Sequence, residues 1–258
     1  MLSKDDLAGG LSTAIVGKKL FLFETIDSTN SCARALGDAG TAEGAVVVAE
    51  YQTNGRGRLG RTWSAEPGTS LLFSTLLRPP ITVETAGLLT LFASAAIARA
   101  VERSTSLTVE CKWPNDLLLG GKKFCGILIE NSFQQAGLSY AVIGAGINVN
   151  QQEFPEEIAA RATSLARETG TSFERNKILL SILSELDSMY TSVRRGEFEL
   201  AFSEWTKRCG MFGKAITVQE HDSTVSGVAV RLHRDGGLVI RMAEGERTIY
   251  AGDVSVLS

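Results

Sequence analysis

The sequence predicts an α+β domain followed by a small all-β domain. Two observations lead to this fold class. Up to residue 209, segments with strand character are mixed with helical patterns, whereas from residue 210 only short alternating segments joined by turn residues occur. About fifty residues of the second kind suit a small β-barrel module. We therefore expect two domains, at residues 1–209 and 210–258.

The first strands are expected to carry polar residues to their ends. Residues 20–30 (LFLFETIDSTN) start apolar and end in helix-capping residues, which predicts a strand and then a helix over 31–38. Residues 44–53 form a β-branched buried strand, and residues 69–78 resume strand character after a charged loop. Residues 82–103 are predicted to form the longest helix, because their acidic start and basic end match the helix dipole.

The rest of the chain continues with strands, then helices, then strands alone. Strand patterns come first, at residues 107–113, 123–131 and 140–150. Helical spacing returns at residues 156–167, 173–194 and 197–207. The terminal module has short alternating segments at residues 215–220, 224–232, 237–242 and 247–252.

Composition and charge restrict the classes of function. The 258 residues carry a formal net charge of -3, which argues against a protein that coats nucleic acid, so any anion site must be local. The four cysteines form no C-x-x-C pair and only two histidines could join them, which favours reduced thiols over a zinc site or a disulfide framework. The acidic start lacks the apolar core of a signal peptide, and the longest apolar helix pattern is too short for a bilayer. We therefore expect a cytoplasmic protein.

Residues 54–63 (NGRGRLGRTW) concentrate positive charge on a bare backbone. Arg56, Arg58 and Arg61 present planar forks of donors that suit phosphate or carboxylate oxygens. The interleaved glycines let the backbone approach a ligand closely. We interpret the segment as an anion clamp. The alternatives are a solvated turn and a loop that grips RNA with Trp63 as a stacking surface. The phosphate-binding motif G-x-x-x-x-G-K-[ST] does not occur in the sequence, which excludes a standard P-loop.

A second group of polar residues surrounds the next predicted corner. Lys112 closes one strand, Asn115 and Asp116 lie at the corner, and Lys123 opens the next strand. Two lysines and one carboxylate could then face one cleft. Each residue taken singly also has a structural interpretation, because Asn and Asp form turns and lysines are ordinary surface charges.

Five motifs occur in one order along the chain: DSTN (27–30), EYQTNGRGRLGRTW (50–63), KWPNDLLL (112–119), GKKFCGILIE (121–130) and GAGINVN (144–150). In this order and approximate spacing, the sequence resembles the biotin protein ligases. About twenty residues precede the first predicted strand, too few for a winged helix-turn-helix, so the chain resembles the monofunctional class without a DNA-binding domain. Leu59 departs from the family pattern, because many members carry arginine there.

The resemblance implies a fold and an activity. The fold would be a class II synthetase-like mixed sheet flanked by helices, with a small C-terminal SH3-like β-barrel. The activity would be that of an ATP-dependent biotin ligase, which forms biotinyl-5′-AMP with ATP and Mg²⁺ and transfers biotin to a specific lysine. The implied partner is the biotin carrier domain of a carboxylase of the acetyl-CoA carboxylase type, with no DNA and no membrane, and a homodimer is left open. The alternative enzyme is a lipoate or octanoate ligase or transferase of the same superfamily.

The resemblance also implies roles for individual residues. The catalytic cations would be Arg58, Lys112 and Lys123. The residues implied in biotin binding are Ser28, Thr29, Asn30, Gln52, Arg56, Gly57, Arg58, Lys123 and Gly126. The residues implied in ATP binding are Arg58, Arg61, Trp63, Lys112, Asn115, Asp116 and Asn148. Asp116 would also meet the metal, Mg²⁺, through the phosphates.

Overall fold

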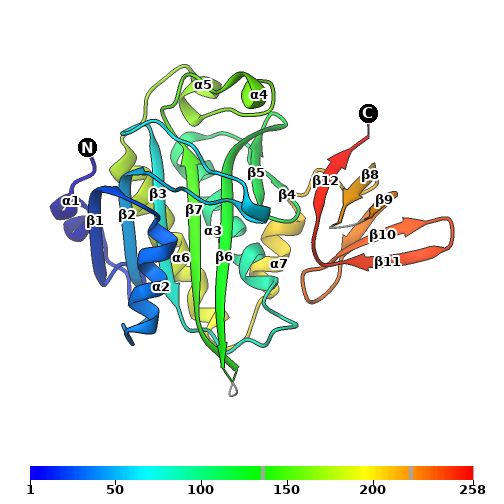
Figure 1. Cartoon of the computed structure of the whole chain (residues 1–258), viewed down its shortest axis with the longest axis horizontal. Helices are drawn as coiled ribbons and strands as arrows, with labels where there is room; N and C mark the ends of the chain where they lie inside the picture. Colours follow the sequence, from blue (N-terminus) through cyan, green and yellow to red (C-terminus); the bar gives the residue numbers. More distant parts are fainter. Residues whose placement is uncertain (135–136, 221–222, 258) are drawn as a thin grey trace.

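A seven-stranded mixed sheet forms the larger part of the molecule, with the strand order β1–β2–β3–β7–β6–β5–β4 (Figure 1). The structure is a computed structural model and describes residues 1–134, 137–220 and 223–257. β1 and β2 pair in parallel, and the other neighbouring strands pair antiparallel. The strands are β1 (Lys19–Ile26), β2 (Ala45–Gln52), β3 (Ser70–Leu77), β4 (Glu110–Lys112), β5 (Asp116–Leu119), β6 (Lys122–Gln134) and β7 (Gly137–Asn148).

Helices cover the two faces of this sheet unequally. Alternate apolar residues of the strands, such as Phe73 and Ile143, form a buried core with Phe92 of α3 (Leu88–Thr105) and Ile182 of α6 (Arg175–Val193). On the opposite face, α2 (Thr29–Asp38) packs on β2, β3 and β7 in a second, smaller cluster (Figure 1). The remaining helices are α1 (Lys4–Gly10), α4 (Glu156–Ala159), α5 (Leu165–Thr169) and α7 (Glu199–Thr206). One face is therefore fully packed, while α2 covers only part of the other.

The C-terminal segment forms a second sheet with the order β11–β10–β9–β8–β12, all antiparallel. Its strands are β8 (Ala215–Gln219), β9 (Thr224–Leu232), β10 (Leu238–Met242), β11 (Gly245–Ile249) and β12 (Asp253–Val256). In the part of the chain that is described, β11 and β12 lie at its two edges, so the sheet is open and not a closed barrel. The indole nitrogen of Trp113 donates to the backbone oxygen of Gly236 (3.1 Å) and ties this sheet to the larger one.

The predicted fold class is confirmed, and several predicted elements differ in extent. The helix predicted over residues 156–167 was wrong in its middle. The backbone nitrogens of Lys123 and Thr163 donate to the oxygens of Arg161 and Lys123, at 2.8 and 2.9 Å. Residues 161–163 therefore pair with the start of β6, and the helical pattern splits into α4 and α5.

The other differences concern shorter segments. The helix predicted from residue 82 begins only at Leu88. The strand predicted over 107–113 contracts to β4, while Asp116–Leu119, predicted only as a corner, forms β5. No sequence pattern predicted α1. Among the described residues, no helix has the length and apolar character needed to cross a membrane.

Candidate active site

The sheet face that α2 covers in part carries a continuous row of predicted site residues. Across neighbouring strands, Lys112 pairs with Asp116, Asp116 with Gly126, and Gly126 with Gly146. Directly opposed residues of a sheet project to the same side, so these four lie on one face. Val142, four residues before Gly146 on β7, packs under α2 and identifies the face. Strand pairing thus brings together three of the five motifs, from residues 112–119, 121–130 and 144–150.

Glycines form the floor of this face, and because they lack side chains, two other segments can lie close to the strand backbones. A Cβ on Gly146 would lie 2.3 Å from Cε2 of Trp63, and one on Gly126 would lie 2.8 Å from the same ring. A Cβ on Gly144 would lie 1.9 Å from Oδ1 of Asn30. Contacts this short leave no space for a side chain, so the ring of Trp63 and the amide of Asn30 rest directly on the β6 and β7 backbones.

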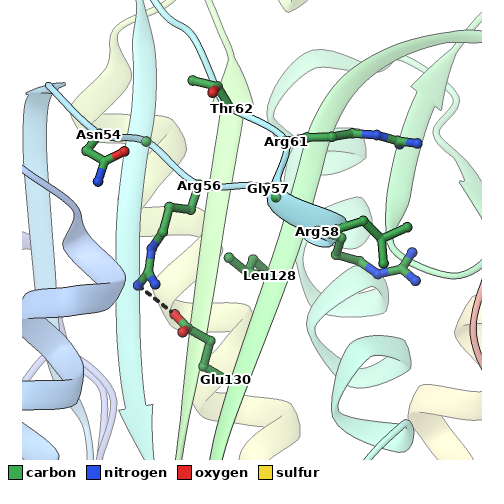
Figure 2. Close-up of a pocket in the computed structure, with 11 residues that line it drawn as sticks. Asn54, Arg56, Gly57, Arg58, Arg61, Thr62, Leu128 and Glu130 are labelled. Carbon is green, nitrogen blue, oxygen red and sulfur yellow. Dashed lines mark hydrogen bonds and ion pairs between the residues drawn. The ribbon is translucent and has the colours of Figure 1, made fainter. Parts of the chain in front are cut away.

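The arginine–glycine loop, residues 54–63, crosses the uncovered part of the face as a narrow turn. The nitrogen of Trp63 donates to the oxygen of Gly55 (3.0 Å), and the nitrogen of Gly57 donates to the oxygen of Arg61 (2.7 Å). A short 3₁₀ turn spans Arg58–Gly60, with Leu59 at φ 54° in the left-handed region. The loop, Leu128 and Glu130 line a cavity of about 490 Å³ (Figure 2). Its size lies within the range of small-molecule sites.

The three arginines of the loop have different partners. Arg56 forms an ion pair with Glu130 of β6 (3.0 Å; Figure 2). Arg61 forms an ion pair with Asp253 at the start of β12. Arg58 donates to Oδ1 of Asn115 (3.1 Å) and to the backbone oxygen of Gly252 (3.5 Å). Burial lowers the pKa of the Arg58 guanidinium, against the opposing effect of nearby Asp253. In the described part of the chain Arg58 has hydrogen bonds but no ion pair, so it can still accept an anion.

Polar residues at the start of α2 form a hydrogen-bonded cluster, the polar cluster, with β3 and the end of β2. Ser28 is the N-cap residue, but its side chain does not cap the helix. Oε1 of Gln52 accepts from the backbone nitrogen of Thr29 (2.7 Å) and from its hydroxyl group (3.0 Å). Ser74 of β3 donates to Oδ1 of Asn30 (2.6 Å) and lies 2.8 Å from the Thr29 hydroxyl. These buried or half-buried groups are well placed to hold a polar head group.

The lysine cluster, Lys112 and Lys123, lies on the side of the loop away from the start of α2. Nζ of Lys123 is 2.6 Å from Oδ1 of Asp116 and 5.5 Å from the centroid of the Trp63 ring. Nδ2 of Asn115 donates to the backbone oxygen of Ile127 (2.7 Å), which fixes this side chain between β6 and Arg58. Asn148 is buried on the same face as Gly146, and its Oδ1 has no hydrogen-bond partner within the described residues. That oxygen could accept from a ligand.

Comparison with known protein families identifies the family of this chain. The model of the biotin/lipoate A/B protein ligase family matches residues 22–148, and the biotin protein ligase C-terminal domain matches residues 211–257. The bifunctional ligase/repressor BirA of Bacillus subtilis is 32% identical over 257 residues, which is 99% of this chain and 79% of that protein. This chain belongs to the biotin protein ligase family.

Further relatives of this ligase agree along most of their length. The biotin–[acetyl-CoA-carboxylase] ligase of Mycobacterium tuberculosis is 32% identical over 233 residues, covering 88% of this chain and 85% of that protein. The structure of the Aquifex aeolicus biotin protein ligase in complex with biotin and ATP matches with a TM-score of 0.80 at 32% identity. That match covers 93% of this chain and 99% of that one.

The structure of this ligase brings most of the predicted site residues together and adds several that the sequence did not single out. Around one face it gathers Ser28, Thr29, Asn30, Gln52, Arg56, Gly57, Arg58, Trp63, Lys112, Asn115, Asp116, Lys123, Gly126 and Asn148. Arg61 lines the same cavity but reaches out to β12. The residues missed are Ser74, Leu128, Glu130, Gly144, Gly146, Gly252 and Asp253. A serine inside the apolar run 69–78 was the one clear sequence signal among them.

The predicted metal position has few ligands of its own. Among the described residues, no group of three or more His, Cys, Asp or Glu side chains could hold an ion. Asp116 offers one carboxylate, and Lys123 already occupies one of its oxygens. This donor set fits Mg²⁺ only as an ion that arrives with phosphate ligands, since Mg²⁺ is commonly held by one or two carboxylates and substrate phosphates.

Proposed function

We propose that this chain is an ATP-dependent biotin ligase that forms biotinyl-5′-AMP and transfers biotin to a lysine of a biotin carrier domain. The observation that carries the proposal is the arginine–glycine loop, which lies over a glycine-floored sheet face between the polar cluster and the lysine cluster. The Aquifex aeolicus relative, whose structure contains biotin and ATP, supports this choice of ligands.

The polar cluster at the start of α2 would receive the biotin head group. Thr29, Asn30, Ser74 and Gln52 offer hydroxyl and amide groups within one hydrogen-bonded cluster. A cyclic urea presents two N–H donors and one carbonyl acceptor, and mixed hydroxyl and amide side chains can complement both. The valeryl carboxylate would then point along the face toward the loop and the lysines.

The cations on the opposite side would promote the first half-reaction. A carboxylate oxygen of biotin attacks the α-phosphorus of ATP, the bond to the β-phosphate bridge breaks, and pyrophosphate leaves. Because both reactants are anions, prearranged positive charge lowers the barrier. We assign this role to Arg58, Lys112 and Lys123. Removing one such contact should cost about 3 kcal/mol of transition-state stabilisation, by analogy with oxyanion donors.

We assign the nucleotide to the side of the site that carries Trp63 and Asn148. The Trp63 ring would contact the adenine, and the unpaired Oδ1 of Asn148 would accept from the nucleotide. Mg²⁺ would be held by the phosphates together with Asp116 and would supply further positive charge to the phosphoryl oxygens.

The second half-reaction requires the loop to exclude water and then to admit the carrier. The lysine nitrogen attacks the acyl carbon of the mixed anhydride, the acyl carbon–oxygen bond breaks, the nitrogen loses a proton, and AMP leaves with the bond electrons. A closed loop protects the anhydride from hydrolysis until the lysine arrives. The names of the Mycobacterium tuberculosis and Paracoccus denitrificans relatives, biotin–[acetyl-CoA-carboxylase] ligase, support a carboxylase as the carrier.

Biotin-dependent exchange of labelled pyrophosphate into ATP tests the proposal. We expect exchange with biotin and none with lipoate or octanoate. Folded protein that exchanges label only with lipoate or octanoate would support the alternative enzyme of the same superfamily, and absence of exchange with every acid would refute an adenylate-forming activity. Tight RNA binding that weakens steeply with salt and is indifferent to biotin would support the RNA-binding alternative.

We also propose a cytoplasmic location, a domain division between residues 209 and 210, and, as an open question for light scattering, a homodimer. The four free cysteines support a reducing compartment. The family models, which match 22–148 and 211–257, support a division close to residue 210.

A further inference from the structure

One acidic residue, Glu130, lines a cavity whose other charged residues are arginines. A carboxylate close to an anionic substrate raises the energy of the bound substrate, so its presence needs a compensating role. Oε2 of Glu130 accepts from Nδ2 of Asn30 (2.7 Å) and from the guanidinium of Arg56 (3.0 Å), and Oε1 accepts from Arg34 (3.3 Å). The charge of Glu130 is therefore directed toward α2 and the loop.

The register of the sheet places Glu130 where it can connect three segments. Glu130 lies opposite Val142 on the face that α2 covers, two residues beyond Leu128 at the cavity wall. From there it reaches α2 through Asn30 and the start of the loop through Arg56. Arg56 also donates to the hydroxyl of Ser31 on α2 (3.2 Å). The carboxylate thus joins β6, α2 and the loop at a single point.

A carboxylate accepts hydrogen bonds only, and this property sets the direction of the bonds beyond it. Because Glu130 cannot donate, Asn30 must turn its Nδ2 toward Glu130 and its Oδ1 toward Ser74. The Ser74 hydroxyl then donates to Oδ1 of Asn30 (2.6 Å) and shares its hydrogen with the Thr29 oxygen (2.8 Å), and the Thr29 hydroxyl donates to Oε1 of Gln52 (3.0 Å).

The result is a polar cluster with a defined arrangement of donors and acceptors. The hydroxyl hydrogens of Ser74 and Thr29 are both used within the protein, and both residues are buried, so their hydroxyl groups serve the network itself. The oxygen of Gln52 is also used, which leaves its Nε2 as a donor, beside Gly55 of the loop. The half-buried amide of Gln52 therefore presents an N–H donor, which suits the carbonyl of a urea-type head group.

We infer that Glu130 is a specificity-determining and positioning residue: it orients Asn30 and Ser74 so that the polar cluster, through Gln52, selects a urea-type head group, and it couples that cluster to the loop through Arg56. The inference rests on the proposed function. Arg56 is neutralised by Glu130, whereas Arg58 stays available to the acyl phosphate. The two arginines of the motif therefore have separate tasks.

The Glu130→Gln variant tests this inference, because an amide of the same shape lets Asn30 take either orientation. In pyrophosphate exchange we expect the KM for biotin, and for dethiobiotin with the same urea, to rise about 10- to 100-fold, the range of a hydrogen bond to a charged group. The kcat should stay within about threefold, and the melting temperature should not change. In ligand-free protein, trypsin should cleave after Arg56 several times faster. Arg34→Ala is the matched control, since it removes the other, 51% exposed, cation of Glu130 and should resemble the unchanged protein.

Ser74→Ala provides a second, independent variant. It breaks the same line of hydrogen bonds without touching the loop, so it should raise the KM for biotin but leave trypsin cleavage unchanged. The KM for biotin of the double variant should be little higher than that of Glu130→Gln alone, because both substitutions act through one network. An unchanged KM in Glu130→Gln, an equal effect of Arg34→Ala, or a loss only in kcat or melting temperature would overturn the inference. Absence of exchange by the unmodified protein would instead refute the proposed function.

Discussion

The contact between Trp63 and the β7 backbone gives the sharpest test of how the site is built. In the Gly146→Ala variant the new methyl group would lie 2.3 Å from Cε2 and 2.5 Å from Nε1 of the indole ring. Ordinary van der Waals contact begins at 3.4 Å, so the ring would have to retreat by at least about 1 Å. β7 is paired on both sides and cannot move easily, whereas Trp63 ends a loop. The displacement should therefore fall on the loop.

The expected effect follows from the cost of overpacking. An added methyl group in a packed site typically costs about 1–3 kcal/mol. If loop closure over the ligands needs Trp63 in its place, this cost appears as a 5- to 150-fold weaker apparent affinity, at about 1.4 kcal/mol per factor of ten. The melting temperature should fall little, because the open loop relieves the clash.

Pyrophosphate exchange over a range of biotin and ATP concentrations measures this effect, and thermal unfolding checks the fold. Gly9→Ala is the control glycine substitution, since a Cβ there meets nothing within 4 Å. In a Trp63→Ala background, Gly146→Ala should have no further effect, because the clashing ring is gone. Activity equal to that of the unmodified protein, or the same loss with and without Trp63, would show that contact between Trp63 and β7 does not control loop closure.

Three further predictions concern other parts of the molecule. Burial alone would raise the pKa of Glu204, but hydrogen bonds from Lys207 and Arg208 lower it to about 2. The ionised carboxylate therefore stabilises the fold above its ordinary pKa of 4.5, and this stabilisation is lost as pH falls toward 2. Glu204→Gln should lower the free energy of unfolding by about 3 kcal/mol at pH 7 and by progressively less below pH 4.5. Chemical denaturation at several pH values measures this loss, and a loss that did not depend on pH would contradict the prediction. Asp253→Asn should leave the melting temperature unchanged, because its partner Arg61 is 65% exposed. The same variant should raise the KM for ATP about 2- to 5-fold in exchange assays. A destabilised protein with a normal KM would count against a role of Asp253 in holding the loop. Arg58→Gly should fold normally but release biotinyl-5′-AMP at least about ten times faster, which is measured as labelling of bystander lysines. Release at the normal rate would show that Arg58 does not retain the adenylate.

The parts of the site that could be predicted from the sequence are those in which local chemistry decides position. An apolar run that ends in Ser28 and Thr29 predicts a strand and then a helix, and the structure contains both, although the Ser28 side chain does not cap the helix. The arginine–glycine loop was expected between two strands, and it joins β2 to β3. The glycines of GAGIN carried only a weak signal, because the sequence does not tell which rings or amides rest on them.

Long-range pairing decided the rest. Glu130 ends an ordinary strand pattern, and only the β6–β7 register and the packing of α2 bring it to Asn30 and Arg56. Asp253 lies 192 residues after Arg61, and no local pattern announces their contact. The helix predicted over 156–167 was wrong in its middle for the same reason, because residues 161 and 163 form backbone hydrogen bonds with Lys123 at the start of β6. Tertiary hydrogen bonds overrode local helical spacing there.

Closure of residues 54–63 over biotin and nucleotide on the glycine-floored face of the sheet can be followed by hydrogen–deuterium exchange of the whole chain, with and without biotin and a non-hydrolysable ATP analogue. We expect strong protection of peptides covering residues 54–63 and 27–31 and the middle of β6 and β7 when both ligands are added. Protection elsewhere, with the arginine–glycine loop exchanging equally fast in both conditions, would contradict this closure.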